Sequence, residues 1–318
     1  MPRFNYGGQA LIEGVLMRGR DAIAVAFRHP DGQIVWASES LDKGPHAWRL
    51  ARAPLVRGLI VLYETLIVGT RWLVRSASVQ AAGSSEEGEE GVELGKGSVA
   101  LMLGLTLALG VGVFFLLPLF IASAATSSIQ ADWVQHTVEG LVRVGIFLGY
   151  LALIARAPDI RRVFEYHGAE HMTIHALEAG DPLTTDAVRK YPTAHPRCGT
   201  EFLVVVIVLS IFAFGFLGRN NPWYVLIGGR LLLIPVIAAL GYEILRFGAK
   251  HRANQVVKAI MAPGILVQMI TTKRPTDDQI EVAIVSMEQA LEADGESIPA
   301  GSELPERERL RDPAAAVA

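Results

Sequence analysis

The sequence predicts an α-helical polytopic membrane protein with about four transmembrane helices, additional cytoplasmic helices and a small N-terminal β-hairpin. Three observations support this fold class. The 318 residues are 51% hydrophobic and only 19% charged, which is too apolar for an average soluble protein. Four stretches approach the length of about 20 mostly apolar residues that a spanning helix needs. The basic residues gather in alternate loops, as they do in multi-pass proteins.

The four apolar stretches are expected to form two transmembrane hairpins, at residues 98–155 and 201–247. The individual spans cover residues 98–126, 140–155, 201–218 and 223–247. The second stretch is short for a span and would have to borrow residues upstream. The prediction is therefore weakest at this span.

Loop charge orients the predicted spans. Eleven Lys and Arg residues precede the first span, and six lie in the central loop at 156–200, but none lies between residues 126 and 140. The positive-inside rule then puts both termini and the central loop in the cytoplasm. The expected partner is the lipid bilayer. The net charge of −3 gives no reason to expect binding to nucleic acid.

The segments outside the spans have distinct patterns. Residues 1–50 contain two strand-like runs joined by a turn at Pro30-Asp31-Gly32, which predicts a β-hairpin. The other segments are an amphipathic interfacial or re-entrant helix at 51–82, an acidic flexible linker at 83–97, C-terminal cytoplasmic helices at 248–293 and a disordered tail at 294–318.

The central loop carries the run "EYHGAEHMTIHALEAG" at residues 165–180. His167, Glu170 and His171 form the pattern H-x-x-E-H. Two imidazoles one helical turn apart can bind one ion, and the glutamate beside them can act as a general base toward water. His175 lies further along the same helix face, where we expect it to be a bystander, and Glu178 is an accessory candidate.

A second chelating pattern ends the same loop. In "AHPRCGTEF", His195 and Cys198 have H-x-x-C spacing on a turn, which is common among zinc ligands. We therefore expect a divalent metal, with zinc the leading choice, bound by His167, His171, His195 and Cys198. Four protein ligands would close the coordination sphere and make the site structural. Catalysis would require one of the four to lie outside it, with Glu170 as the base.

Three functions stay open at this point. The first is a metal-dependent hydrolase acting on a peptide or a lipid-linked molecule at the cytoplasmic face, and the second is a scaffold or assembly factor with a structural metal. The third, a transporter or ion pathway, ranks last because the spans are nearly bare of polar groups apart from Arg143, Arg230 and Glu243. We expect Arg230 to snorkel to the interface. A solvated polar face or a proton relay would also account for the histidines, and a homo-oligomer is left open.

The glycine-rich start of the chain matches neither phosphate-binding loop pattern, so a nucleotide site is rejected. It does place Glu13 and Arg18 in flexible backbone on the cytoplasmic side, where a structural turn and an active-site loop both stay open. Together with Glu178 and with Glu243 at the inner end of the last span, these residues are the accessory site candidates.

Four motifs together resemble the YqhQ-like family. They are "GGQALIEGVLMRG", "YHGAEHMTIHALE", "HPRCGTEFL" and "TTKRPTDDQIEVAI", which are spread over nearly the whole chain. The family consists of bacterial membrane proteins with a domain of unknown function, described as predicted metal-dependent enzymes. The resemblance implies a multi-pass protein of the bacterial inner membrane. It implies no substrate, and the family pattern does not include His175 or the acidic linker. Its metal label would fall on the residues His167, Glu170, His171, His195 and Cys198.

Overall fold

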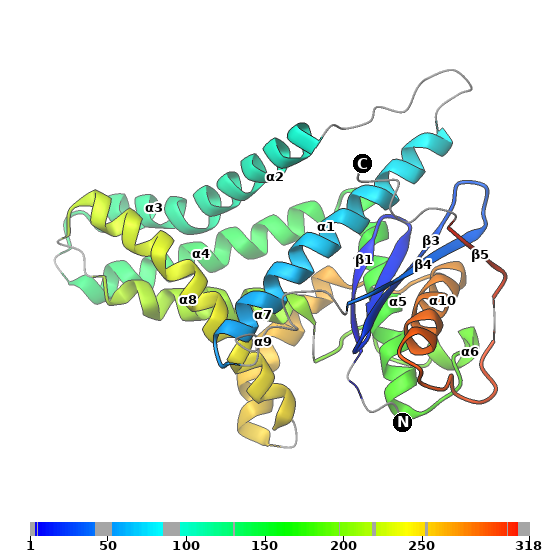
Figure 1. Cartoon of the computed structure of the whole chain (residues 1–318). Helices are drawn as coiled ribbons and strands as arrows, with labels where there is room; N and C mark the ends of the chain where they lie inside the picture. Colours follow the sequence, from blue (N-terminus) through cyan, green and yellow to red (C-terminus); the bar gives the residue numbers. More distant parts are fainter. Residues whose placement is uncertain are drawn as a thin grey trace.

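The computed structural model describes Phe4 and residues 6–41, 53–84, 96–129, 131–196, 198–217, 221–251, 254–303 and 305–310. The described chain is mostly helical. It divides into a group of apolar helices on one side and a β-sheet packed among helices on the other (Figure 1). Most of the predicted acidic linker, residues 85–95, lies outside the described residues.

The N-terminal strands form a larger sheet than the predicted hairpin. Strands β1 (Gly7–Leu11), β2 (Gly14–Arg18), β3 (Ala22–Arg28) and β4 (Ile34–Ser40) pair antiparallel in chain order. The predicted turn joins β3 to β4, and Gly32 there has the positive φ of 92° that a glycine adopts without strain. Single-sequence patterns identified only one of these hairpins, because β1 and β2 are short and rich in glycine.

The predicted C-terminal tail is partly ordered, so this part of the prediction is wrong. Strand β5 (Arg307–Arg309) pairs parallel with β4 at the edge of the sheet. Leu310 N–H donates to Trp36 O at 2.8 Å, and the Arg309 guanidinium lies 5.4 Å from the centre of the Trp36 ring. The exposed edge of a sheet offers backbone N–H and C=O groups that have no partner. The polar segment Arg307–Arg309 pairs with these groups of β4, even though its composition is typical of a loop. Residues 311–318 lie outside the described part.

Helices cover both faces of the sheet. Helix α1 (Val56–Ser84) packs on one face, where Trp72 joins an apolar cluster with Val25 and Phe27. Helices α5 (Pro158–Ala179) and α10 (Asp277–Ala293) pack on the other face. The run "AIAVAFR" of β3 is apolar on both sides for this reason, since successive side chains point to opposite faces.

Charged side chains of α1 pair with residues of the sheet. Glu64 accepts a hydrogen bond from Arg18 of β2 at 2.8 Å, and Arg71 pairs with Glu39 of β4. The same helix packs against α8 (Trp223–Lys250). Helix α1 therefore joins the sheet to the apolar helices, and its interfacial or re-entrant position stays a prediction.

Three helices in the described residues are long and apolar enough to cross a membrane, one fewer than predicted. They are Leu101–Ala125, Trp133–Ile154 and Trp223–Lys250, of 25, 22 and 28 residues. The first is built from α2 (Lys96–Val111), the π-helical turn η3 (Gly112–Leu116) and α3 (Leu117–Ala125), and the second lies within α4 (Asp132–Ile154).

The predicted third span, residues 201–218, forms the shorter helix α7 (Gly199–Gly215) of 17 residues. At 1.5 Å per residue it is about 25 Å long, less than the roughly 30 Å of a bilayer core. Helix α9 (Gln255–Thr271) is a second apolar helix of this length, in a segment predicted as cytoplasmic. The remaining element is the short helix α6 (Thr185–Val188).

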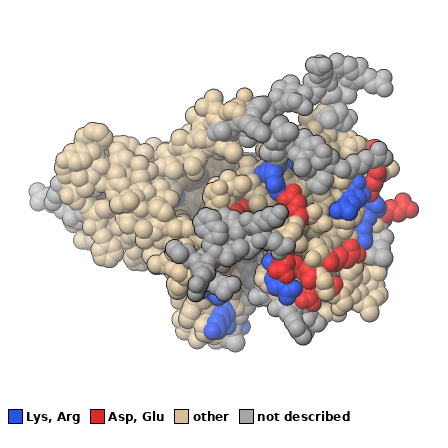
Figure 2. All heavy atoms as spheres, viewed as in Figure 1, with Lys and Arg blue, Asp and Glu red and all other residues tan. Residues whose placement is uncertain are grey.

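Surface charge separates the two parts of the molecule. On the face shown in Figure 2, Lys, Arg, Asp and Glu gather over the sheet and its helices, whereas the end formed by α3, α4 and α8 is almost uncharged. Large apolar side chains are exposed on the uncharged part, including Leu105 at 69%, Leu141 at 68% and Leu232 at 74%. Such a surface is expected of helices that face lipid.

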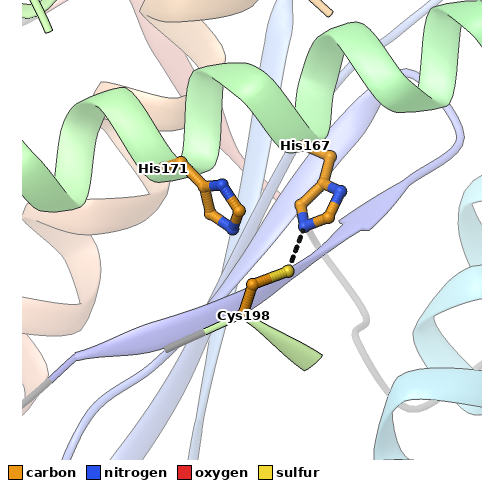
Figure 3. A group of neighbouring side chains, drawn as sticks. All are labelled: His167, His171 and Cys198. Carbon is orange, nitrogen blue, oxygen red and sulfur yellow. Dashed lines mark hydrogen bonds between the residues drawn. The ribbon is translucent and has the colours of Figure 1, made fainter. Parts of the chain in front are cut away.

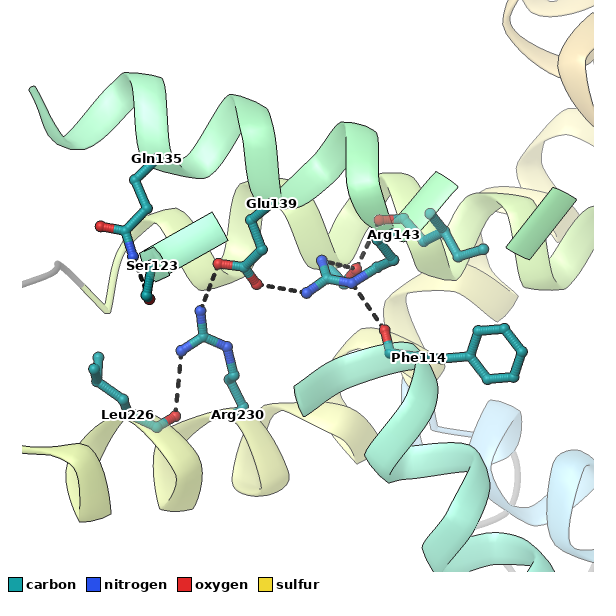
Figure 4. A network of polar contacts seen from close by, with 9 residues as sticks. Phe114, Ser123, Gln135, Glu139, Arg143, Leu226 and Arg230 are labelled. Atoms are coloured by element: carbon teal, nitrogen blue, oxygen red, sulfur yellow. Dashed lines mark hydrogen bonds and ion pairs between the residues drawn. The ribbon is translucent and has the colours of Figure 1, made fainter. Parts of the chain in front are cut away.

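The apolar helices enclose an ion network that corrects the prediction for Arg230 (Figure 4). Arg230 does not snorkel, because it is 2% exposed and donates to Glu139 of α4 at 2.8 Å. Glu139 also accepts from Arg143 at 2.6 Å, and Arg143 donates to Phe114 O of η3 and to Ser210 Oγ of α7. The spans are thus less bare than predicted, and the network joins four helical segments.

Candidate functional site

Helix α5 presents all the histidines of the quoted run. Pro158 occupies its first turn, and Gly180 ends it in the left-handed conformation with φ 77°, which glycine adopts readily. Residues such as Ala169 and Met172 are fully buried against the sheet and α10. The opposite face of α5 therefore turns toward the segment at 191–198 and toward α9.

Gly168 allows a second chain segment to cross α5 closely. A Cβ atom at this position would lie 2.0 Å from Lys273 O, and Lys273 N–H donates to Phe164 O at 2.9 Å. The crossing brings Thr271 O within 2.9 Å of His167 Nδ1. The glycine in "HGAEH" is therefore required for the orientation of the neighbouring imidazole.

The first set of converging side chains consists of His167, His171 and Cys198, which we call the His–Cys group (Figure 3). Both imidazoles project from α5 toward the thiol, and His167 Nε2 lies 3.2 Å from Cys198 Sγ. One ligand atom from each residue lies within 4.8 Å of the others. Nδ1 of His167 faces Thr271 O, and Nδ1 of His171 lies 2.6 Å from Thr193 O. Donation from Nδ1 leaves the Nε2 lone pair for a cation, as is usual for histidine ligands.

Burial favours the neutral forms of this group. It lowers the pKa of His171 well below the usual value, with His167 acting in the same direction, so His171 stays an uncharged donor at neutral pH. Burial also raises the pKa of Cys198 to about 11, so the thiol is protonated in the absence of a cation. A bound metal ion reverses this preference, because a coordinating thiol is deprotonated.

Glu170 lies between the two histidines in sequence and is 4% exposed. Burial raises its pKa to about 8, while the neighbouring His167 acts in the opposite direction. The Gly8 N–H of β1 donates to this carboxylate, and Oε2 has no hydrogen-bond partner among the described residues. A Cβ atom on Gly8 would approach Glu170 Cδ to 3.0 Å, so the glycine-rich strand closes over the carboxylate. The sequence suggested this loop as a candidate without indicating that contact.

The second set consists of His175, Glu178 and His195, which we call the His–Glu group. His195 Nε2 lies 3.4 Å from Glu178 Oε2, and the His175 and His195 rings are 4.5 Å apart at their centres. The four predicted ligands are thus divided, since His195 lies in this group and not with Cys198. His175, expected to be a bystander, lies beside His195, and Glu178 is the one accessory candidate in a converging group.

Gln268 of α9 holds the second chelating motif in place. Its Oε1 accepts from His195 N–H at 2.8 Å and its Nε2 donates to His195 O at 2.9 Å. The side chain is fully buried. Sequence reasoning missed this residue, and the only signal was a lone amide in the apolar run "GILVQMI".

The other accessory candidates lie in ion pairs outside both groups. Glu13 pairs with Arg162 of α5 and accepts from Tyr166 Oη at 3.1 Å, which ties the β1–β2 turn to the helix. Arg18 donates to Glu64, and Glu243 accepts from Arg57 Nε at 2.7 Å. These contacts position elements around the site and bring no further ligand to it.

Comparisons with known proteins give one family and one relative. The family model described as "Protein of unknown function (DUF1385)" matches residues 53–293, a range that contains both groups. The chain is 33% identical over 294 residues to "Uncharacterized protein YqhQ" of Bacillus subtilis (strain 168), covering 90% of this chain and 92% of that protein. No solved structure matches the chain.

Proposed function

The chain belongs to the DUF1385 family of proteins of unknown function, as the four motifs predicted, and within it we propose a metal-dependent membrane hydrolase. His167, His171 and Cys198 would bind one zinc-like divalent cation. Glu170 would act as the general base. The observation that carries the proposal is the convergence of two imidazoles and a thiol near a buried carboxylate, one of whose oxygens has no partner in the described part of the chain.

The residues of the His–Cys group fit a catalytic cation. Two nitrogens and one sulfur are ligands that zinc accepts, and three protein ligands leave a position open for substrate or water. The separation of His195 from this group favours the open arrangement over a closed structural site. A divalent cation there would supply Lewis acidity to a water and to a carbonyl or phosphoryl oxygen.

Glu170 has the properties of a proton acceptor in a dry site. Burial raises the pKa of Glu170 to about 8, so without a cation the carboxyl group holds a proton at neutral pH. A divalent cation beside it would lower this pKa and favour the carboxylate form that a general base needs. Gly8 N–H fixes the carboxylate, and Oε2 is left to take a proton from water. The adjacent strand β1 limits access of bulk solvent to this carboxylate.

We propose that the site lies at the cytoplasmic face of a bacterial inner membrane. Helix α5 and the sheet are next to basic segments that the positive-inside rule assigns to the cytoplasm, and the same rule assigns both termini to that side. Helix α7 would complete four crossings, with local thinning of the bilayer compensating for its length. The substrate would be a peptide or a lipid-linked molecule that reaches the site from the interface.

The test is the metal content of the purified full-length protein and its variants. Zinc should copurify with the native chain, and His171→Ala should lose it from the His–Cys group. Loading with Co²⁺ should produce a thiolate charge-transfer band that Cys198→Ser abolishes. His29→Ala, which removes a surface imidazole paired with Asp31, is the matched control. Equal, negligible metal in the native protein and in His171→Ala would refute the proposal.

Glu170→Gln separates a catalytic site from a structural one. The variant should keep its metal and lose hydrolysis of fluorogenic peptides or p-nitrophenyl esters that the native protein cleaves. Retention of both metal and hydrolysis would exclude Glu170 as the base. It would favour the alternative of a scaffold with a structural cation.

A further inference from the structure

We propose that His175, Glu178 and His195 form a second divalent-cation site beside the His–Cys group. One ligand atom from each residue lies within 4.8 Å of the other two. The three side chains come from two segments, the last turns of α5 and the turn before Cys198. A cation bound by these three residues requires no hydrolase activity at the His–Cys group.

The distance between His195 and Glu178 fits two ligands of one ion. His195 Nε2 and Glu178 Oε2 are 3.4 Å apart. A direct hydrogen bond between an imidazolium and a carboxylate is shorter, about 2.7–2.9 Å. Two atoms each about 2.1 Å from a tetrahedral cation are about 3.4 Å apart. The spacing of these two atoms therefore matches that of two ligands of one tetrahedral cation.

The rings of this group are held as ligand rings usually are. His175 Nε2 lies 2.9 Å from Ala194 O, a backbone contact of the kind that orients a ligand imidazole. Tyr191 stacks on the His175 ring at 6.0 Å between centres and 8° between planes, and its hydroxyl donates to Asp181 at 2.7 Å. The Gln268 side chain fixes the His195 backbone through hydrogen bonds to both its N–H and its C=O. Such orientation reduces the entropy lost on binding a cation.

The two sites differ in donor chemistry and in access. The His–Glu group offers two nitrogens and an oxygen, which suit zinc and also harder cations such as Mn²⁺ or Fe²⁺, whereas a thiolate favours softer ions. Glu178 is 33% exposed, which gives a cation a path from solvent. The His171 and His195 rings are 5.7 Å apart at their centres, so the two sites are adjacent on one face of α5.

Zinc stoichiometry tests the second site. After removal of metal and equilibrium dialysis against Zn²⁺, the native chain should bind two ions. Glu178→Gln and His175→Ala should each bind one and keep the cobalt–thiolate band. Cys198→Ser should also bind one, at the other site. Glu281→Gln, a partly exposed carboxylate on α10, is the matched control and should bind two.

Mn²⁺ provides a second measurement that depends on donor type. Electron paramagnetic resonance should show one bound Mn²⁺ in the native protein and in Cys198→Ser, and none in Glu178→Gln. One zinc per chain that Cys198→Ser removes and Glu178→Gln spares would overturn the second site and leave the proposed function standing. A chain that binds no zinc would refute both. Circular dichroism of each metal-free variant separates lost binding from lost folding.

Discussion

Glu139 in α4 and Glu170 in α5 are both buried carboxylates, but their surroundings differ. Each oxygen of Glu139 accepts from one guanidinium, Arg143 at 2.6 Å and Arg230 at 2.8 Å. Glu170 accepts from Gly8 N–H and has an oxygen with no partner among the described residues. The two arginines neutralise Glu139 within the protein. Glu170 instead lies near imidazole and thiol groups, and among the described residues no arginine or lysine pairs with it.

This difference in hydrogen bonding separates the network around Glu139, which we interpret as structural, from the His–Cys group, which we propose binds a cation. Arg143 donates to three different groups, so most of the hydrogen-bonding capacity in the helix network is satisfied internally. In the His–Cys group, two imidazole nitrogens converge on a thiol, which is the arrangement of the proposed cation site. We therefore expect changes in the network to affect stability and changes in the histidine groups to affect metal content.

The largest effect is expected from Glu139→Leu. The variant leaves two buried guanidiniums facing each other in an apolar bundle without a counter-charge. Breaking a buried pair by removing one partner costs about 3–5 kcal/mol. The midpoint of thermal unfolding in detergent should fall steeply, while the zinc content of the folded fraction should stay at the native level.

Glu281→Gln is the control for this prediction, because its pair with Arg28 is partly exposed and 3.2 Å long. Exposed pairs contribute about 0–1 kcal/mol. If Glu139→Leu destabilised the protein as little as Glu281→Gln, the network around Glu139 would not be a structural cluster.

Gln268→Leu should affect both stability and metal binding. The substitution removes the two hydrogen bonds that Gln268 makes with the buried N–H and C=O of His195, at a cost of about 2–4 kcal/mol. It should also weaken zinc binding by the His–Glu group, because the His195 ring is no longer fixed. Denaturant unfolding and zinc dialysis measure the two effects. Unchanged affinity at this group would show that the clamp serves folding alone.

Glu288 of α10 is an intermediate case, since one oxygen pairs with Arg307 and the other has no partner among the described residues. Burial outweighs the arginine and raises its pKa from 4.5 to about 7. The folded state therefore holds the proton more tightly than the unfolded state. The contribution of Glu288 to stability is fully present below pH 4.5 and is lost as pH rises through about 7, by up to about 3 kcal/mol.

Glu288→Gln should remove this part of the pH dependence, because an amide does not ionise. Denaturant titrations of the native and variant proteins at several pH values between 4.5 and 8 measure it. Parallel curves for the two proteins would show that the Arg307 pair compensates fully for burial.

Gly168→Ala tests the close crossing over α5. The new methyl group would meet Lys273 O at 2.0 Å, so the segment after α9 must move. We expect a loss of about 1–3 kcal/mol, the usual cost of overpacking, and weaker zinc binding through displacement of Thr271 O from His167. Gly149→Ala in α4, with open space around its Cβ position, is the control. Native zinc affinity in Gly168→Ala would separate the crossing from the site.

The extent of sequence-based prediction follows from these contacts. His167, Glu170 and His171 share one helix, so their spacing alone brings them together. The placement of His195 depends on Gln268, some seventy residues later, and on the packing of α9, which no local pattern reports. The extra strand β5 and the pairing of Arg230 with Glu139 were missed for the same reason. Strand β5 pairs with β4, and Arg230 pairs with Glu139, so each has its partner far away in the sequence. The local composition of both segments predicted that their polar groups would be exposed.

The smallest effect is expected from Glu243→Gln. Glu243 accepts from Arg57 Nε at 2.7 Å and from Leu55 N–H at 3.1 Å, and both charged side chains are about one-fifth exposed. An amide oxygen can still accept from Leu55 N–H, so the loss should be about 0–1 kcal/mol. Zinc content should not change, because the residue lies in neither histidine group. Loss of zinc in this variant would show that an ion pair outside the histidine groups can also be part of the metal centre. The distinction between ion pairs that affect stability and histidine groups that affect metal content would then no longer hold.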